Sequence, residues 1–169
     1  MGYYDLSTSN SPKVNKYTSK IGILITLFNY LDFHIQIFIE AIINLERDKC
    51  TTKTIIYMVR SFSFPKRVEF LKSLVGNVHK DKFNDYIKIH EEVLKCNDIR
   101  NNFAHSQIYF WDDPKGTHMF MSNMKKSIPT PVIKYLPLSI VDLDRYIERF
   151  NKITEIFHKF TYELGYFQC

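Results

Sequence analysis

A long stretch without proline, from Lys16 to Arg47, constrains the fold of this chain most strongly. Apolar residues recur in it at the three- and four-residue steps typical of one face of an α-helix: Ile21, Leu24, Phe28, Leu31, Ile35, Phe38, Ile42 and Leu45. A second apolar set fills much of the remaining circumference: Leu27, Tyr30, Ile37 and Ile39. A helix that is apolar on most sides has to be covered on most sides. The stretch therefore either runs through the centre of a helical bundle or is covered on one face by a second copy of the chain.

The polar residues of this helix and the composition of the chain indicate where the protein works. The helix is interrupted by Asp32, His34, Gln36 and Glu40, which argues against a membrane span. Residues 1–15 are polar, lack the apolar core of a signal peptide and predict a flexible leader. The three cysteines show no metal-ligand spacing and fit a reducing compartment. We expect a cytoplasmic protein with no metal site, no cofactor and no membrane association.

Length and composition predict one globular domain, residues 16–169. Hydrophobic residues make up 45% of 169 positions, enough for a substantial core. The chain has only 5 Gly and 6 Pro, and this low number favours long uninterrupted helices or strands. The net charge of +5 suits a polyanionic partner such as RNA.

Further helices follow the first. The segment Lys53 to Ser61 is short and apolar and fits a helix or a strand, of which we favour the helix. Pro65 is suited to the first turn of a helix that runs to about Val75 and ends at Gly76-Asn77. Another regular helical pattern runs from about Asp81 to Ala104.

The last third of the chain predicts a small β-hairpin and a final helix. Two aromatic segments, Gln107–Trp111 and His118–Met121, flank a turn that contains Pro and Gly. Lys125 to Pro137 carries three prolines and predicts an extended connection, so hairpin and connection together occupy about 107–138. Ser139 and Asp142 resemble a capping box before a helix that reaches about Leu164. The expected fold is all-α, an antiparallel bundle of four to five helices with a hairpin after the helix that ends at Ala104.

The end of that helix carries the residues best suited to chemistry. Arg100 offers a planar fork of donors for phosphate, and His105 can accept and give a proton near neutral pH. Asn101 and His105 are four residues apart and share a helix face. Arg100 and His105 diverge by about 140° on an ideal helix. They converge only if the helix ends near Phe103 or the Arg side chain bends back.

This run, Arg100-Asn101 followed after three residues by His105, with Ala104 before the His, resembles the signature of the HEPN family. Members are small all-helical domains, many of them metal-independent ribonucleases, and their active sites typically lie at a two-fold dimer interface. The resemblance implies a catalytic set of Arg100, Asn101 and His105 in a homodimer that acts on RNA. The implied reaction is attack of a ribose 2′-hydroxyl on its own phosphodiester, which leaves a 2′,3′-cyclic phosphate.

Several other residues are candidates for the same site, each with a structural alternative. Lys66 and Arg67 either bind RNA phosphate or only solvate a helix start. Tyr109 and Trp111 either stack on RNA bases or pack on the bundle. Two polar residues one turn before the motif, Asn97 and Asp98, either orient Arg100 and His105 or serve as capping and surface residues. We expect His90 to be a core or interface histidine.

The resemblance also implies a biological setting. Ribonucleases of this type commonly act in stress or phage defence, so a toxin or antiphage effector with an antitoxin or defence partner is expected. HEPN toxins whose antitoxin is a nucleotidyltransferase carry a Tyr two residues after the His, where this chain has Gln107. That pairing is therefore in doubt. The alternatives are a non-catalytic HEPN-like module that binds RNA, nucleotide or a partner protein, and an unrelated structural bundle.

Overall fold

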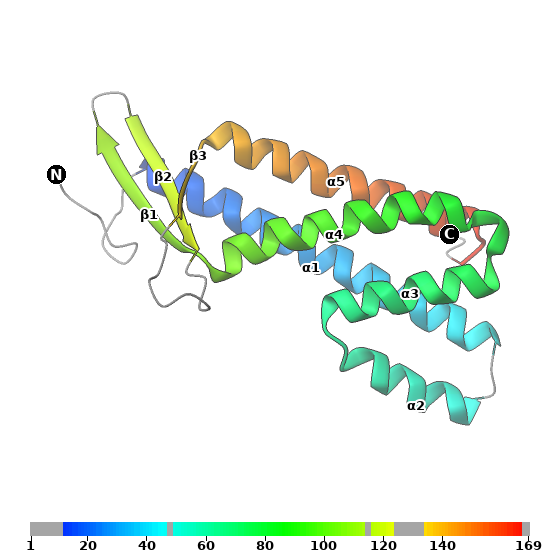
Figure 1. Ribbon diagram of the computed structural model, residues 1–169. Coiled ribbons are helices and arrows are strands. Elements are labelled where there is room, and N and C mark those ends of the chain that lie inside the picture. Colours follow the sequence, from blue (N-terminus) through cyan, green and yellow to red (C-terminus); the bar gives the residue numbers. More distant parts are fainter. Residues whose placement is uncertain (1–11, 47–48, 114–115, 124–133, 167–169) are drawn as a thin grey trace. The chain divides into compact units, whose positions relative to one another are not determined.

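The computed structural model describes residues 12–46, 49–113, 116–123 and 134–166 (Figure 1). In chain order the elements are α1 (Pro12–Glu46), α2 (Lys49–Arg60), α3 (Phe64–Val78), the 3-10 helix η1 (Lys80–Lys82), α4 (Phe83–His105), β1 (Gln107–Asp113), β2 (Gly116–Asn123), β3 (Lys134–Leu138) and α5 (Ile140–Glu163). The fold is mainly helical, as predicted, and the segment that fitted either a helix or a strand is the helix α2.

Contacts divide the chain into two compact units. Unit 1 comprises residues 1–26 and 98–149, and unit 2 comprises residues 27–97 and 150–169. Each unit is described by itself below. Residues 1–11 of the predicted leader lie outside the described residues, and α1 begins at Pro12, ahead of the predicted start at Lys16. Proline suits this first helical position because its missing N–H would have no helical partner there.

The core of unit 2 is formed by aromatic side chains on α1, α3 and α5. Phe28 of α1 lies against Phe64 and Phe150, with ring centroids 4.7 and 6.4 Å apart. Further along α1, Phe38 meets the edge of Phe157 at 5.7 Å. The apolar face predicted for this helix is accordingly buried at Phe28, Leu31, Ile35, Phe38 and Ile42. The chain's own core covers this face, whereas Tyr30 of the second apolar set is 46% exposed.

Two acidic residues of α1 are paired with arginines of neighbouring helices in unit 2. Asp32 forms an ion pair with Arg67 of α3. Glu40 accepts two hydrogen bonds from Arg60 of α2, at 2.9 and 3.1 Å. By length and apolar composition, α1 is the one helix in the described part of the chain that could cross a membrane, a test that the core helix of a soluble protein also meets.

The predicted end of α3 at Gly76-Asn77 is wrong, because the helix continues through both residues to Val78. His79 then caps it, with its backbone N–H donating to the carbonyl of Val75 at 2.8 Å. Gly76 has a different role: a Cβ at this position would lie 3.1 Å from the Phe83 ring. The glycine therefore allows the start of α4 to approach α3 closely, which local sequence signals do not reveal.

Unit 1 contains a three-stranded antiparallel sheet in the order β1-β2-β3. The predicted hairpin is confirmed. Of the predicted extended connection, residues 125–133 lie outside the described residues, and the remainder lies in β3, a strand that the sequence did not predict. Phe110, Met119 and Leu138 are register partners across the sheet and are buried. Tyr17 of α1 meets Phe110 edge-on at 5.6 Å. The strand β3 tolerates Pro137 because it lies at the edge of the sheet, where a missing N–H breaks no ladder.

The predicted capping box starts α5. The carboxylate of Asp142 accepts from the Ser139 N–H at 2.9 Å, and the Asp142 N–H donates to Ser139 Oγ at 3.1 Å. These bonds satisfy two of the backbone donors that a helix start leaves unpaired. The Ser139 hydroxyl also donates to the Asp142 carboxylate at 2.6 Å, and this bond, together with the one from the Ser139 N–H, lowers the pKa of the Asp142 carboxyl.

Candidate functional site

The motif predicted from the sequence occupies the last turn and a half of α4, in unit 1. Because α4 is helical through His105, its geometry fixes the directions of the motif residues. Asn101 and His105 lie on one face, whereas the Cβ atoms of Arg100 and His105 diverge by about 140°. The helix does not end at Phe103, so the first of the two routes to convergence is closed.

The second route, a bend in the arginine side chain, is partly realised. Arg100 Nη1 donates a 3.0 Å hydrogen bond to Oδ1 of Asn101. Asn101 starts only about 40° around the helix from His105. The amide therefore draws the guanidinium away from its own direction and toward the face that carries the imidazole.

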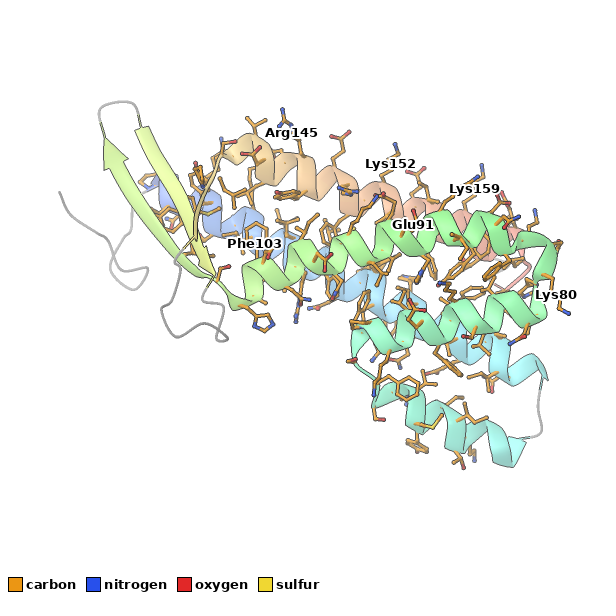
Figure 2. The ribbon with its side chains drawn as sticks, in the orientation of Figure 1. Lys80, Glu91, Phe103, Arg145, Lys152 and Lys159 are labelled. Carbon is orange, nitrogen blue, oxygen red and sulfur yellow. The ribbon has the colours of Figure 1, made fainter. Side chains whose placement is uncertain are left out.

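The motif residues are accessible. The side chains of Arg100 and Asn101 are half-buried, and His105 is exposed. Between them, Phe103 is buried and its ring meets the edge of Tyr146 from α5 at 6.2 Å. Figure 2 labels Phe103 on α4 and Arg145 on α5, where Arg145 projects outward. Phe103 thus anchors the end of α4 while the polar motif residues remain reachable from solvent.

The expectation that Arg67 contacts RNA from the surface is wrong. Arg67 is only 7% exposed. Its guanidinium is paired with Asp32, and Nη2 donates to the Phe62 carbonyl at 3.0 Å. The alternative that it merely solvates a helix start is wrong for the same reason. Its neighbour Lys66 is exposed, as both interpretations required.

The residues expected to support the motif fall in different environments. Asn97 is buried, with 7% of its surface exposed, so it is neither a surface nor a capping residue. Asp98 is exposed. Tyr109 and Trp111 lie in β1, where they pair in register with Phe120 and His118, but their side chains lie outside the described residues.

His90 is a core histidine, as predicted. It is 4% exposed, and burial lowers its pKa, an effect that the nearby Glu69 opposes. Its Nε2 lies 2.8 Å from Glu69 Oε1, although the ring N–H is not directed along a hydrogen bond. The contact therefore contributes little while the imidazole is neutral.

Unit 2 contains a pair of histidines whose contact the sequence did not predict. The rings of His34 on α1 and His158 on α5 meet at 4.1 Å, and Tyr30 packs on His34 at 4.3 Å. Burial lowers the pKa of both imidazoles, and for His34 the charge of His158 adds to the effect. The spacing of Tyr30 and His34 places them on one helix face, but no local pattern indicates that His158 lies opposite.

No group of three or more His, Cys, Asp and Glu suited to a metal ion occurs in the residues that the structure describes. The motif residues at the end of α4 are a cation and an amide that contact each other, and an imidazole on the face of the amide. Such a set can bind a phosphate and move a proton.

Comparisons with known proteins returned no match. No family model matches the chain. No curated protein matches it, and no solved structure does.

Proposed function

We propose that this protein is a HEPN-like endoribonuclease that cleaves RNA without a metal ion, through Arg100, Asn101 and His105. One observation carries the proposal: the Arg100 guanidinium is held by Asn101, one helical turn before an exposed imidazole on the same face. The net charge of +5 favours a polyanionic substrate. The motif resemblance supplies the reaction class.

In the proposed reaction His105 removes the proton from a ribose 2′-hydroxyl, and the 2′-oxygen attacks the adjacent phosphorus. Arg100 stabilises the negative charge that builds on the phosphorane oxygens. The bond to the 5′-oxygen breaks, and that oxygen takes a proton from an acid. The products are a 2′,3′-cyclic phosphate and a 5′-hydroxyl.

A single chain supplies one imidazole at this motif, whereas the reaction needs a base and an acid. We therefore propose a homodimer in which the His105 residues of two copies share these roles. Apolar side chains exposed in unit 1 support self-association: Ile23 on α1 is 44% exposed and Val141 on α5 is 57% exposed. The proposed setting is the cytoplasm, as a toxin or antiphage effector controlled by a partner protein.

The test is cleavage of labelled RNA by purified protein in EDTA, with analysis of the product ends. We expect 2′,3′-cyclic phosphate ends, and a loss of about 100-fold or more in rate for His105→Ala, because a general base contributes about that much. Arg100→Ala should lose a comparable factor, since it removes charge stabilisation of the phosphorane. Arg145→Ala is the matched control because Arg145 is an exposed arginine of unit 1 (Figure 2).

Three results would contradict the proposal: a requirement for added metal, products with other ends, or cleavage that survives both motif substitutions. Expression of the wild type in a bacterial host should also be toxic, and both substitutions should relieve the toxicity.

The second candidate is a HEPN-like module that binds RNA, nucleotide or a partner protein without cleavage. The continuous helix favours it, because the side chains of Arg100 and His105 leave the helix in directions about 140° apart. RNA binding that Arg100→Ala weakens, with no cleavage by the wild type, would establish this function instead.

A further inference from the structure

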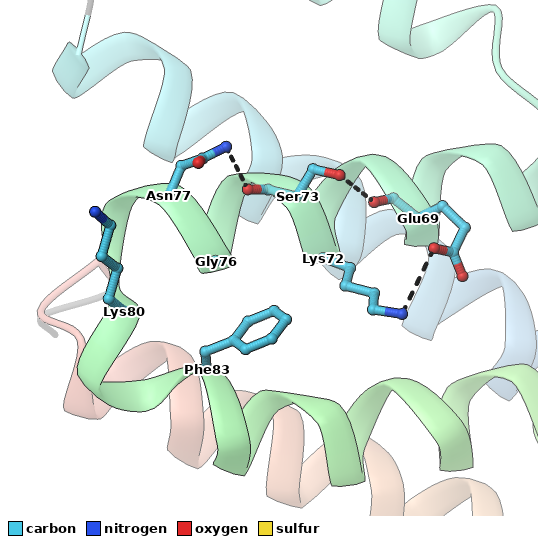
Figure 3. A pocket seen from close by; sticks show the side chains of 7 residues that line it. All are labelled: Glu69, Lys72, Ser73, Gly76, Asn77, Lys80 and Phe83. Atoms are coloured by element: carbon cyan, nitrogen blue, oxygen red, sulfur yellow. Dashed lines mark hydrogen bonds and ion pairs between the residues drawn. The ribbon is translucent and has the colours of Figure 1, made fainter.

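A groove in unit 2 lies between α3 and the start of α4, and its lining mixes an aromatic ring with lysines and polar groups (Figure 3). Its volume is about 500 Å³. That size falls within the range of about 300–1,000 Å³ of sites for small organic ligands. None of its lining residues belongs to the motif on α4.

The floor of the groove is the ring of Phe83. Figure 3 shows this ring beneath Gly76, whose missing side chain makes room for it: a Cβ there would lie 3.1 and 3.2 Å from two ring carbons. Phe83 is only half-buried although it is a large apolar side chain. An accessible aromatic ring held against a helix backbone is a platform on which a planar ring can stack.

Two lysines flank this platform, Lys72 from α3 and Lys80 from η1 (Figure 3). Against them stands one carboxylate, Glu69, so the lining has an excess of positive charge. The ion pair between Lys72 Nζ and Glu69 Oε2 is long, at 3.9 Å; the Glu69 side chain is exposed and the Lys72 side chain is half-buried. An ion pair of this kind contributes little stability, so an anion can readily take over the Lys72 ammonium.

The rim adds a polar edge. Asn77 Nδ2 donates to the Ser73 carbonyl at 2.9 Å, and Ser73 Oγ donates to the Glu69 carbonyl at 3.2 Å. These bonds hold both side chains at the edge of the groove. Within the described residues, they leave the Asn77 carbonyl oxygen and its second N–H for a ligand.

We propose that this groove binds a nucleotide, with the base stacked on Phe83, the base edge at Asn77 and the phosphate on Lys72 or Lys80. The combination decides the ligand class. A bare anion would not use the aromatic floor, and an uncharged aromatic compound would not use the lysines. The groove shares no lining residue with the motif, and the proposal does not rest on the proposed ribonuclease activity. The nucleotide is either free or one unit of an RNA strand.

The test is isothermal titration of the full chain with AMP, adenosine and ribose 5-phosphate at low salt. AMP should bind at one site per chain, and each of its two halves should bind at least ten-fold more weakly. Phe83→Leu should weaken AMP binding about ten-fold, because it removes base stacking. Lys80→Met should weaken it several-fold and reduce its salt dependence.

Matched controls lie in the same unit. Lys88→Met removes an exposed lysine of α4 outside the groove, and Phe70→Leu removes an aromatic ring of α3 outside it. Both controls should bind AMP as the wild type does. If Phe83→Leu proves unfolded by circular dichroism, Lys72→Met and Lys80→Met decide the question, because Lys72 is half-buried and Lys80 is exposed, so neither is a core side chain.

A final arm identifies the source of the nucleotide and uses His105→Ala throughout, so that RNA stays intact. Tetraadenylate RNA that displaces AMP assigns the groove to an RNA strand, and failure to displace it assigns the groove to free nucleotide. Absence of AMP binding at millimolar concentration overturns the proposal, as does binding that the Phe83 and lysine substitutions leave unchanged. Loss of RNA cleavage in His105→Ala with AMP binding retained keeps the two proposals distinct.

Discussion

The guanidinium of Arg67 on α3 is buried against the carboxylate of Asp32 on α1, and it also donates to the Phe62 carbonyl. Its Nε has no hydrogen-bond partner among the described residues. A charge removed from water in this way depends on its counter-charge, because the loss of either partner leaves the other poorly solvated. This pair therefore joins two helices of unit 2.

Arg67→Met should lower the free energy of unfolding by about 2–4 kcal/mol, near the lower end for buried pairs because the Asp32 side chain keeps some contact with water. The measurement is urea denaturation followed by circular dichroism. The neighbouring exposed Lys66 provides the control, since Lys66→Met should change stability by no more than about 0.5 kcal/mol. The double variant Asp32→Leu, Arg67→Met should recover part of the loss. If Arg67→Met proves as stable as the control Lys66→Met, the ion pair contributes nothing to stability.

Replacement of two helical glycines by alanine should have different outcomes. Gly22 of α1 is surrounded by open space, with no atom within 4 Å of the point where a Cβ would lie, so Gly22→Ala should stabilise the protein by about 0.5–1 kcal/mol through helix propensity alone. Gly76→Ala should gain less or destabilise, because the new Cβ would press on the Phe83 ring. Thermal unfolding of the two variants side by side measures the difference. The same gain at both positions would refute the close approach at Gly76.

Acid should destabilise the protein through three histidines, of which His90 is buried and His34 and His158 are half-buried. Burial lowers the pKa of His34, His158 and His90, so between their folded and unfolded values the unfolded chain binds more protons. Stability is therefore complete above the unfolded value, near pH 6.5, and falls as the pH drops below it. We expect Tm to be a few degrees lower at pH 5.5 than at pH 7.5.

The histidine pair can be separated from the carboxylates, which also titrate in acid. Replacing His34 and His158 by Gln should flatten the Tm profile between pH 7.5 and 5.5. His79→Gln serves as the control because this half-buried ring, bonded to the Tyr166 hydroxyl at 2.8 Å, lies outside the pair. An unchanged slope in the double variant would assign the acid sensitivity to other groups.

Asn101 should act as a positioning residue in the proposed nuclease. Asn101→Ala removes the acceptor that holds Arg100 Nη1, so we expect kcat to fall about ten-fold, equivalent to about 1.4 kcal/mol. Asn101→Gln should restore part of the rate by offering the same amide on a longer stem. Single-turnover cleavage of labelled RNA measures both variants. A change in KM alone would indicate that Asn101 contacts substrate instead.

The sequence alone determined the features that depend on neighbours a few residues away. Helical periodicity placed the long first helix and its buried face, the Ser139–Asp142 capping box placed the start of α5, and alternating aromatic segments around a Pro-Gly turn placed the hairpin. The motif could be recognised because Arg100, Asn101 and His105 lie within two turns of one helix. Each of these patterns acts through short-range geometry that any chain with that spacing shares.

Only the tertiary structure decided the features that depend on residues far apart in the chain. Arg67, a candidate for RNA binding from the sequence, is buried and paired with Asp32. The ring of His158 on α5 contacts that of His34 on α1. Gly76 reads locally as a helix end, but the Phe83 ring makes it a point of close approach inside a helix. The strand β3 forms by pairing with β2, and its position at the edge of the sheet is compatible with Pro137. Burial and pairing arise from three-dimensional neighbours, and no local spacing encodes which neighbour that is.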